Sequence, residues 1–346
     1  MAAGLRGDAV DRLVRLCAAG LDPDALRGEV LTRLRRLMTV DAAFFATVDP
    51  ATLLFTSAVV DDPLQTVAPQ FMANELGGAD VNRFADLADA PDHVRSLDDA
   101  TRGERGASER FREVMAPLGL GDELRAALVV DGWCWGVLCL HRERASAGFA
   151  AQDVELVRRL GPHLARGLRE GLVAAPRAPG SPAEGPGVLV VAPDGQVVSA
   201  TPEAQRWLAV LGPGRDGDLP VAVRAVVMAA LRTPSSPSPR DVLVPTRDGR
   251  WAGVTASVLV GDGPPGVAVV LAAAPPQRVT SALLAGYGLT PAQQRVTELV
   301  LRGRSTRQMV RELHLSEYTV QEYLRGAFDR VGVNSRRELM ASLMAR

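Results

Sequence analysis

The chain has 346 residues, a formal net charge of −1 and 47% hydrophobic residues, which suits a globular protein of two or three domains. No apolar stretch reaches the ~18 residues of a membrane-spanning helix, and the N-terminus lacks the apolar core of a signal peptide. All 39 basic residues are arginine. This excludes a Walker-type phosphate loop and lysine Schiff-base chemistry, because both need a lysine. The three cysteines are too few for a disulfide framework, so we expect a cytoplasmic protein without membrane contact.

The first predicted domain covers residues 1–172 and combines helices with strands. A helix begins at Pro23, strands are predicted at 42–48 and 53–60, and a hairpin over 124–141 turns at Asp131-Gly132, a strong two-residue turn signal. A helix over 152–172 closes the domain. This order and the Asp-Gly-Trp-Cys-Trp-Gly hairpin resemble a GAF domain, a small-molecule and signalling module. The resemblance implies an α/β sheet domain that receives a small-molecule effector or a protein partner.

The 152–172 helix carries an apolar stripe that we interpret as a dimer seam. Four residues at helical spacing form the stripe: Val157, Leu160, Leu164 and Leu168. Gly161-Pro162 should kink the helix, because proline cannot donate to the preceding turn.

Cysteines and histidines of the first domain are the residues with metal-binding chemistry, and their spacing does not favour a site. Cys134 and Cys139 are five residues apart in one strand and should point to opposite faces of the sheet. His93, His141 and His163 show no ligand spacing, and we expect them at the surface or half-buried. The sequence therefore predicts no metal site and no cofactor.

Two further groups in this domain have both a functional and a structural interpretation. Trp133 and Trp135 point the same way and either wall a ligand pocket or pack in the core, and core packing is favoured. Asp122-Glu123 next to Arg125 is either a site or the solvated start of a strand, and the solvated start is favoured. No catalytic constellation emerges, so we do not predict an enzyme, and the effector-binding residues stay unassigned.

A Pro- and Gly-rich segment at 173–186 predicts an exposed linker to a middle domain at 187–274. The middle domain shows short strands with turns at Asp194-Gly195 and Asp248-Gly249, and a helix that begins at Thr201-Pro202. It resembles a small PAS-type α/β sheet with a flexible insertion at 232–240.

The last predicted domain, residues 286–346, lays out four short helices. Thr290, Ser305 and Ser335 each precede a Gln or Glu by three positions, the spacing of a capping box. Ser316 caps the third helix, which runs to residue 331 and ends at Gly332. Only residues 313–315 separate the second and third helices, a connector typical of a helix-turn-helix pair.

The third of these helices has one apolar and one polar face at 100° per residue. The apolar arc consists of Val320, Leu324, Ala327, Phe328 and Val331. The polar arc consists of Tyr318, Gln321, Glu322, Arg325 and Asp329.

The segments Leu289-Thr-Pro, Leu315-Ser-Glu-Tyr-Thr-Val and Arg330-Val-Gly-Val-Asn-Ser-Arg resemble the LuxR-type (FixJ/NarL-like) helix-turn-helix domain. The resemblance implies that Gln321, Glu322 and Arg325 read bases, by pairing with adenine, accepting from cytosine and clamping guanine. It implies a set of backbone-contacting residues, which comprises Arg304, Thr306, Ser316, Thr319, Arg330, Ser335 and Arg336. Further attraction to the DNA backbone should come from Arg302, Arg307 and Arg337.

The charge distribution fits a DNA-binding tail on a body that does not bind DNA. From residue 286 onward, ten arginines face six acidic residues, a local charge of +4, whereas the rest of the chain carries −5. The overall prediction is an α+β multidomain chain that ends in an all-α four-helix domain. It is a one-component transcription regulator that binds double-stranded promoter DNA as a homodimer under control of its GAF-like and PAS-like body. Two alternatives remain: a body that only dimerises or contacts proteins, and a body that is an enzyme with a regulatory tail.

Overall fold

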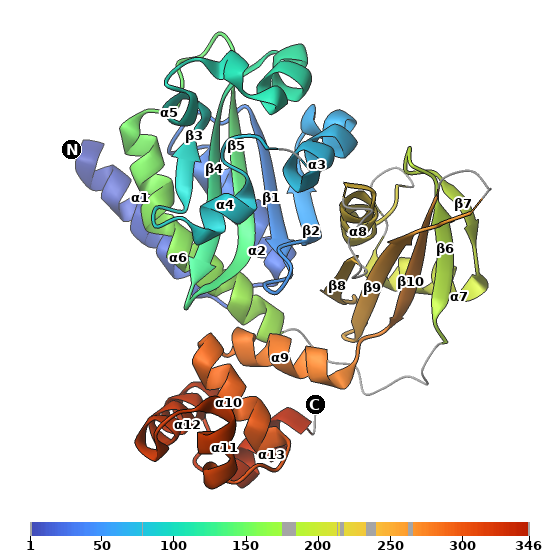
Figure 1. The fold of residues 1–346 in the computed structure, drawn as a ribbon. Coiled ribbons are helices and arrows are strands. Elements are labelled where there is room, and N and C mark those ends of the chain that lie inside the picture. The colour runs from blue at the N-terminus through green and yellow to red at the C-terminus, as the bar shows by residue number, and fades with distance from the viewer. Residues whose placement is uncertain are drawn as a thin grey trace. The chain divides into compact units, whose positions relative to one another are not determined.

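The computed structural model describes residues 2–77, 79–174, 185–212, 214, 218–232, 240–261 and 266–344 (Figure 1). The chain divides into two compact units, Met1–Val129 with Cys134–Ala274, and Val130–Trp133 with Pro275–Arg346. Residues 175–184 of the predicted linker and 233–239 of the predicted insertion lie outside the described residues. Within the described part of the chain, no helix has the length and apolar character needed to cross a membrane.

The first domain is a five-stranded sheet covered by helices. Its strands are β1 (Ala42–Val48), β2 (Phe55–Val60), β3 (Val94–Ser96), β4 (Leu120–Val130) and β5 (Trp133–Glu143), hydrogen-bonded in the order β2-β1-β5-β4-β3. Its α-helices are α1 (Ala2–Cys17), α2 (Pro23–Leu34), α3 (Ala68–Gly77), α4 (Phe84–Asp89), α5 (Leu97–Thr101) and α6 (Ala151–Ala174). Short 3-10 or π turns lie at Leu64–Val67, Arg105–Ala107, Phe111–Met115 and Ala116–Leu118. The predicted strands and hairpin are therefore present.

Helices cover both faces of this sheet. On one face, the ring of Phe44 in β1 lies 5.4 Å from that of Phe71 in α3 and 6.4 Å from that of Phe84 in α4, measured between centroids. α2 and α6 pack on the other face, and α1 packs against α6 (Figure 1). The central strands β4 and β5 are consequently buried along most of their length.

The apolar stripe of α6 belongs to the interior of the first domain. Leu160 and Leu164 are each 1% exposed and Leu168 is 2% exposed. Leu168 packs so closely on β5 that a Cβ added to Gly136 would lie 2.5 Å from its Cδ1 atom. The interpretation of this stripe as a dimer seam is wrong, because the chain's own core already covers it. The helix itself is confirmed, and it continues through Pro162.

The middle domain contains a second five-stranded antiparallel sheet. Its strands are β6 (Gly187–Val191), β7 (Val197–Ala200), β8 (Arg240–Pro245), β9 (Trp251–Val258) and β10 (Val267–Ala273), in the order β7-β6-β10-β9-β8. α7 (Pro202–Leu211) and α8 (Val221–Arg232) pack against the sheet. When the strands of each sheet are numbered in chain order, both sheets have the same order of neighbouring strands. The expected strands and helix are present, and the PAS-type assignment stays a prediction.

The C-terminal domain is helical. It consists of α9 (Pro276–Gly286), α10 (Pro291–Leu301), α11 (Thr306–Leu313), α12 (Glu317–Val331) and α13 (Arg336–Met344). The last four are the predicted helices, and α9 precedes them. Leu289, Val296, Met309, Val320 and Leu339 are completely buried in the shared core of this domain.

Candidate DNA-binding face and a buried polar cluster

Capping boxes start two helices of the C-terminal domain, as the sequence predicts. At α10, Thr290 Oγ1 accepts from the backbone N–H of Gln293 at 3.4 Å, and the Gln293 side chain accepts from the N–H of Thr290 at 3.0 Å. Ser305 and Gln308 form the same reciprocal pair at α11. Each box satisfies two backbone donors that the helix leaves free, so these short helices begin at defined residues.

The box predicted at Ser335 is wrong by one residue. Ser335 Oγ accepts from the N–H of Glu338 at 3.2 Å, but the Glu338 carboxylate accepts from the N–H of Asn334 at 2.8 Å. The start of α13 is thus capped by the same side chains, with the return bond made to the preceding residue.

α11 and α12 form a helix-turn-helix pair with a short connector. α11 ends at Leu313, and its C-cap residue His314 has a φ of +54°, in the left-handed region. Ser316 caps α12 only two residues later, and its Oγ accepts from the N–H of Thr319 at 3.0 Å. Gly332 ends α12 with a φ of +76°. The local sequence therefore fixes where α12 begins and ends.

α12 turns its apolar side toward the domain core and its polar side outward, as its periodicity predicts. Val320 and Ala327 are completely buried and Leu324 is 1% exposed. Gln321 and Arg325 are exposed. Arg325 Nη1 donates to Glu322 Oε1 at 2.6 Å, although the two side chains are 70% and 41% exposed. An exposed pair of this kind contributes ~0–1 kcal/mol, so it holds both side chains only weakly.

Several of the predicted backbone-contacting residues already bond within their own domain. Arg304 pairs with Glu312 at 3.1 Å, and Arg336 Nη2 donates to Thr306 Oγ1 at 2.8 Å. The two arginines lie near the starts of α11 and α13, and the Arg304–Glu312 pair is exposed, so it restrains Arg304 only weakly.

The remaining residues predicted to contact the DNA backbone lie near helix ends. The hydroxyls of Ser316 and Thr319 are 2.8 Å apart at the start of α12. At the end of this helix, Arg330 Nη1 donates to the carbonyl oxygen of Gly288. Ser335 is the N-cap of α13 described above.

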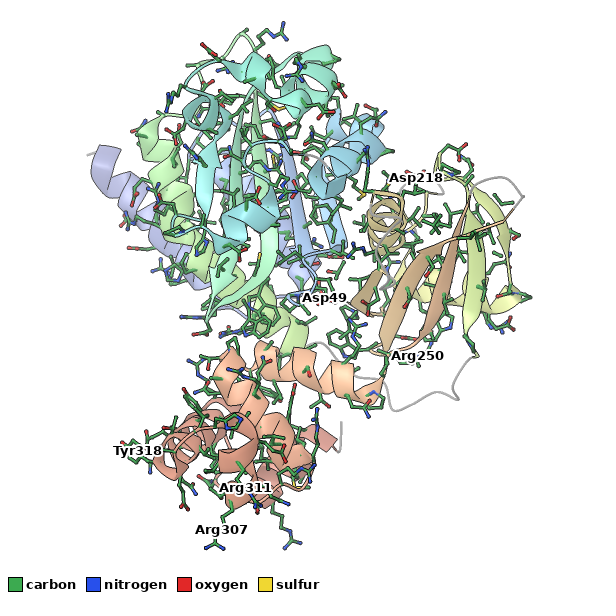
Figure 2. All side chains as sticks on the ribbon, in the orientation of Figure 1. Asp49, Asp218, Arg250, Arg307, Arg311 and Tyr318 are labelled. Atoms are coloured by element: carbon green, nitrogen blue, oxygen red, sulfur yellow. The ribbon has the colours of Figure 1, made fainter. Side chains whose placement is uncertain are left out.

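Two arginines on α11 are exposed and form no ion pair with any described residue. Arg307 and Arg311 lie one turn apart and point away from the domain core, as does Tyr318 at the start of α12 (Figure 2). Arg311 is missing from the predicted set of DNA-contacting residues. Its i,i+4 spacing places it on the same face of α11 as Arg307, which makes Arg311 a further candidate for this role.

A second polar group lies inside the first domain and is centred on Arg110. Arg110 Nη2 and Nε donate to Glu123 Oε2 at 2.7 and 3.0 Å, and both side chains are 0% exposed. Arg110 Nη1 donates to Asn74 Oδ1 at 3.0 Å, and the backbone N–H of Arg110 donates to Asp80 Oδ2 at 2.6 Å. These bonds tie β4 to α3 and to the segment that follows α3.

Arg125 is the second cation of this buried cluster. It forms an ion pair with Glu75 of α3, and its guanidinium carbon lies 3.8 Å from the centroid of the Phe84 ring. A guanidinium over an aromatic face is attracted by the ring quadrupole. Its Nε and Nη1 atoms have no hydrogen-bond partner among the described residues.

Cys139 and His141 complete the cluster from β5. They are two residues apart in one strand and therefore share a face of the sheet. Cys139 Sγ lies 3.0 Å from Glu123 Oε1 and 3.2 Å from His141 Nε2. All three side chains are completely buried, and they form the one group of potential metal ligands among the described residues.

The protonation states in this cluster follow from burial and from the two guanidiniums. Burial opposes the charge of Glu123, but the guanidiniums of Arg110 and Arg125 outweigh burial and lower its pKa to about 2. Burial lowers the pKa of His141 to about 4, so its imidazole is neutral at pH 7. Burial, followed by the charge of Glu123, raises the pKa of Cys139 well above its usual value.

The cluster corrects two expectations from the sequence. Asp122, Glu123 and Arg125 are at most 1% exposed, so their interpretation as a solvated start of a strand is wrong. His141 is 0% exposed rather than half-buried. The physical reason is that β4 and β5 are central strands covered on both faces, where polar side chains are buried together with apolar ones.

Trp135, His93 and His163 lie where the sequence places them, whereas Trp133, also expected in the core, does not. Trp135 is 2% exposed and packs in the core, the favoured interpretation. Trp133, His93 and His163 are half-buried.

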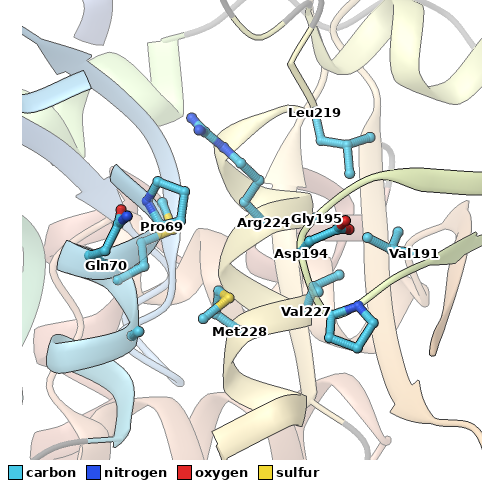
Figure 3. A pocket seen from close by; sticks show the side chains of 12 residues that line it. Pro69, Gln70, Val191, Asp194, Gly195, Leu219, Arg224, Val227 and Met228 are labelled. Carbon is cyan, nitrogen blue, oxygen red and sulfur yellow. The ribbon is translucent and has the colours of Figure 1, made fainter. Parts of the chain in front are cut away.

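A cavity of about 270 Å³ lies between α3 and α8 (Figure 3). Apolar side chains dominate its wall, among them Pro69, Met72, Val191, Leu219, Val227 and Met228. Arg224 is the basic residue of the wall. Its Nη1 lies 3.5 Å from Asp218 Oδ2, and its Nε is buried without a hydrogen-bond partner among the described residues. This lining suits a small apolar or amphipathic molecule.

Comparison with known proteins identifies two segments of the chain. Residues 22–168 match the GAF domain family, and residues 288–343 match the family of bacterial regulatory proteins, luxR family. No curated protein matches the chain.

Similar solved structures include a phage VqmA–DPO complex, with 18% identity over 46% of this chain and 81% of that one and a TM-score of 0.26. The VqsR LBD domain from Pseudomonas aeruginosa has 15% identity over 50% of this chain and 99% of that one, with a TM-score of 0.31. The Vibrio cholera VqmA–ligand–DNA complex has 18% identity over 46% of this chain and 82% of that one, with a TM-score of 0.24. At these values the likenesses support no conclusion about this chain.

Family matches and the geometry of α11 and α12 agree on the class of protein. The match at 288–343 covers the capped helices, the short turn and the outward polar face of α12. The match at 22–168 covers the sheet with its buried cluster. The chain therefore combines a GAF domain with a luxR-family helix-turn-helix domain, and it is a DNA-binding transcription regulator with a GAF sensory domain.

Proposed function

We propose that this protein is a one-component regulator that binds paired promoter half-sites as a homodimer, with α12 in the major groove. The observation that carries the proposal is the outward face of α12, where the polar side chains Gln321, Glu322 and Arg325 occupy neighbouring positions on a helix capped at both ends. In this arrangement Arg325 clamps guanine, Gln321 pairs with adenine and Glu322 accepts from cytosine N4.

The ion pair between Glu322 and Arg325 is compatible with base reading. A bidentate contact to the correct base is worth about 1–3 kcal/mol of discrimination, whereas the exposed pair contributes ~0–1 kcal/mol. DNA can therefore separate the two side chains and engage each with a base.

Backbone attraction in this proposal comes from the edges of the helix pair. Seven residues supply hydroxyl or guanidinium donors to phosphates: Arg304, Thr306, Ser316, Thr319, Arg330, Ser335 and Arg336. Arg307 and Arg311 add exposed positive charge on α11. Their charge supports long-range attraction to DNA but carries no sequence information.

The test is base preference in full-length protein. Preferred duplexes are first selected by the wild type from a random pool, and the affinity ratio between each of them and its single-base variants is measured. This ratio should fall by about 5- to 150-fold when Arg325 is changed to Ala, the equivalent of ~1–3 kcal/mol. Arg337→Ala, an exposed arginine outside the proposed base readers, should weaken all duplexes alike. An unchanged base preference in Arg325→Ala overturns the assignment.

The input side of the proposal is a small-molecule effector taken up by the body. The apolar cavity between α3 and α8 supports it, since a ligand there touches both the GAF domain and the middle domain. Native mass spectrometry of the purified chain should detect a retained small molecule. If the measured mass equals that of the chain alone, no ligand is retained. This result would favour the second candidate, a body that serves only dimerisation or protein contact.

An enzymatic body has less support. Cys139 Sγ lies 3.2 Å from His141 Nε2, a distance at which a histidine base could activate a thiol nucleophile. Both side chains are 0% exposed, so no substrate reaches them in this conformation.

A further inference from the structure

Three side chains of different chemistry meet inside the GAF domain at the distances of a metal-binding site. Cys139 Sγ lies 3.0 Å from Glu123 Oε1 and 3.2 Å from His141 Nε2, and the oxygen and the nitrogen are 4.0 Å apart. A tetrahedral ion with bonds of ~2.3 Å to sulfur and ~2.0 Å to nitrogen and oxygen needs ligand atoms roughly 3.3–3.6 Å apart. Binding would therefore lengthen the two sulfur separations by roughly 0.3–0.5 Å and shorten the oxygen–nitrogen separation by roughly 0.7 Å.

We propose that Glu123, Cys139 and His141 bind one divalent transition-metal ion of the zinc class. Thiolate with imidazole is the ligand combination that selects late first-row ions over magnesium or calcium. Three protein ligands leave a fourth position for a water molecule. The site is independent of the cavity beside α8 and of the DNA-binding face.

The sheet brings the three ligands together. Cys139 and His141 share a face of β5, and Glu123 comes from β4, the neighbouring strand. The spacing of cysteines and histidines along the sequence cannot reveal this group, because its carboxylate lies 16 residues from Cys139. Cys134 belongs to the same strand but lies outside this group, and its thiol donates to the carbonyl oxygen of Gly136 at 3.3 Å.

Charge balance in the buried cluster favours a cation. The carboxylates of Glu75, Asp80 and Glu123 face the two guanidiniums of Arg110 and Arg125, which leaves one negative charge in excess. Exchange of the Cys139 thiol proton for a divalent ion adds one net positive charge and brings the cluster to neutrality. An unbalanced buried charge is costly, so this exchange removes an electrostatic penalty.

Arg110 holds Glu123 in an orientation that suits this role. Its shorter bonds, 2.7 and 3.0 Å, go to Oε2, whereas Oε1 accepts a longer one from Arg110 Nε at 3.2 Å and lies 3.0 Å from Cys139 Sγ. A carboxylate with one oxygen on an arginine and the other on a metal ion is thereby oriented by its outer partner. The unpartnered donors of Arg125 remain available to a fourth ligand on the ion.

Cobalt is the probe for this site, because Co²⁺ bound by thiolate gives a sulfur-to-metal charge-transfer band in the near ultraviolet. The untagged full-length chain is produced in minimal medium supplemented with Co²⁺, and its metal content and absorption spectrum are measured after gel filtration. The expected result is about one Co²⁺ per chain with the thiolate band. Cys139→Ser should lose the band and most of the metal, whereas Cys134→Ser should keep both.

The outcomes separate cleanly. A wild-type chain without stoichiometric cobalt, or a band that survives Cys139→Ser, overturns the proposal. If circular dichroism shows that Cys139→Ser does not fold, His141→Gln takes its place with the same two results. None of these measurements uses DNA, so their failure leaves the proposed DNA reading untouched, and the reverse also holds.

Discussion

The outward face of α12 and the buried cluster behind α3 are both polar, yet their contacts join residues at very different separations in sequence. The Glu322–Arg325 pair joins residues three positions apart on one helix turn. The cluster joins Arg110 to Glu123 across 13 positions and Arg125 to Glu75 across 50. The first kind of contact is exposed and weak, and it can be exchanged for DNA. The second is desolvated, so the removal of one partner leaves a charge that water cannot reach.

The largest expected effect is the loss of a partner in the buried cluster. Arg110→Met should lower the free energy of unfolding by about 3–5 kcal/mol, because Glu123 stays buried without its main counter-charge. Denaturant unfolding of the full-length chain, followed by tryptophan fluorescence, measures it. Arg206→Ala, which breaks an exposed pair with Glu203, should have a much smaller effect, because water and salt screen that pair. Equal effects of the two variants would erase the contrast between buried and exposed pairs.

The stripe of α6 gives the next largest effect. Leu164→Ala should destabilise the chain by about 2–5 kcal/mol through the cavity that it leaves, without changing the association state. Val198→Ala, at a side chain that is 65% exposed, should change stability by no more than ~0.5 kcal/mol. Denaturant unfolding and light scattering measure the two quantities. A shift from dimer to monomer with unchanged stability would restore the stripe as a seam.

A smaller effect is expected where a local capping bond holds a short helix. Ser305→Ala should destabilise α11 by ~0.5–2 kcal/mol, whereas Ser305→Gly should cost only a few tenths of a kcal/mol, because glycine is itself an accepted N-cap. Hydrogen exchange followed by mass spectrometry should show faster exchange of α11 amides in the alanine variant. Similar exchange in the alanine and glycine variants would mean that the cap does not set the stability of this helix.

The smallest effect concerns a single exposed charge. Arg307→Ala should reduce the slope of log binding constant against log salt concentration by about one unit, equivalent to one phosphate contact, with base preference unchanged. Binding titrations at several salt concentrations measure the slope. Arg158→Ala, on α6 of the GAF domain, is the matched control and should leave it unchanged. An identical slope in all three proteins would remove α11 from the proposed DNA interface.

Most helix boundaries of the C-terminal domain could be predicted from the amino-acid sequence, because they depend on interactions between residues close in sequence. Capping boxes at Thr290 and Ser305, the cap at Ser316 and the stop at Gly332 each act within about four residues, as does the periodicity of α12. The capping box at the start of α13 differs from the prediction by a single residue, because the Glu338 carboxylate accepts from the N–H of Asn334 instead of Ser335.

Tertiary structure decided what the sheet residues do. The apolar stripe on α6 has the same sequence pattern whether it packs on the chain's own core or on a partner. In the fold it packs on the core, because Gly136 has no side chain and leaves room for Leu168 against β5. Likewise, Glu123, Cys139 and His141 look unremarkable along the chain and meet only because β4 pairs with β5 beneath α3. Helix caps are encoded by neighbours in sequence, whereas burial and charge pairing depend on which distant segments the fold brings into contact.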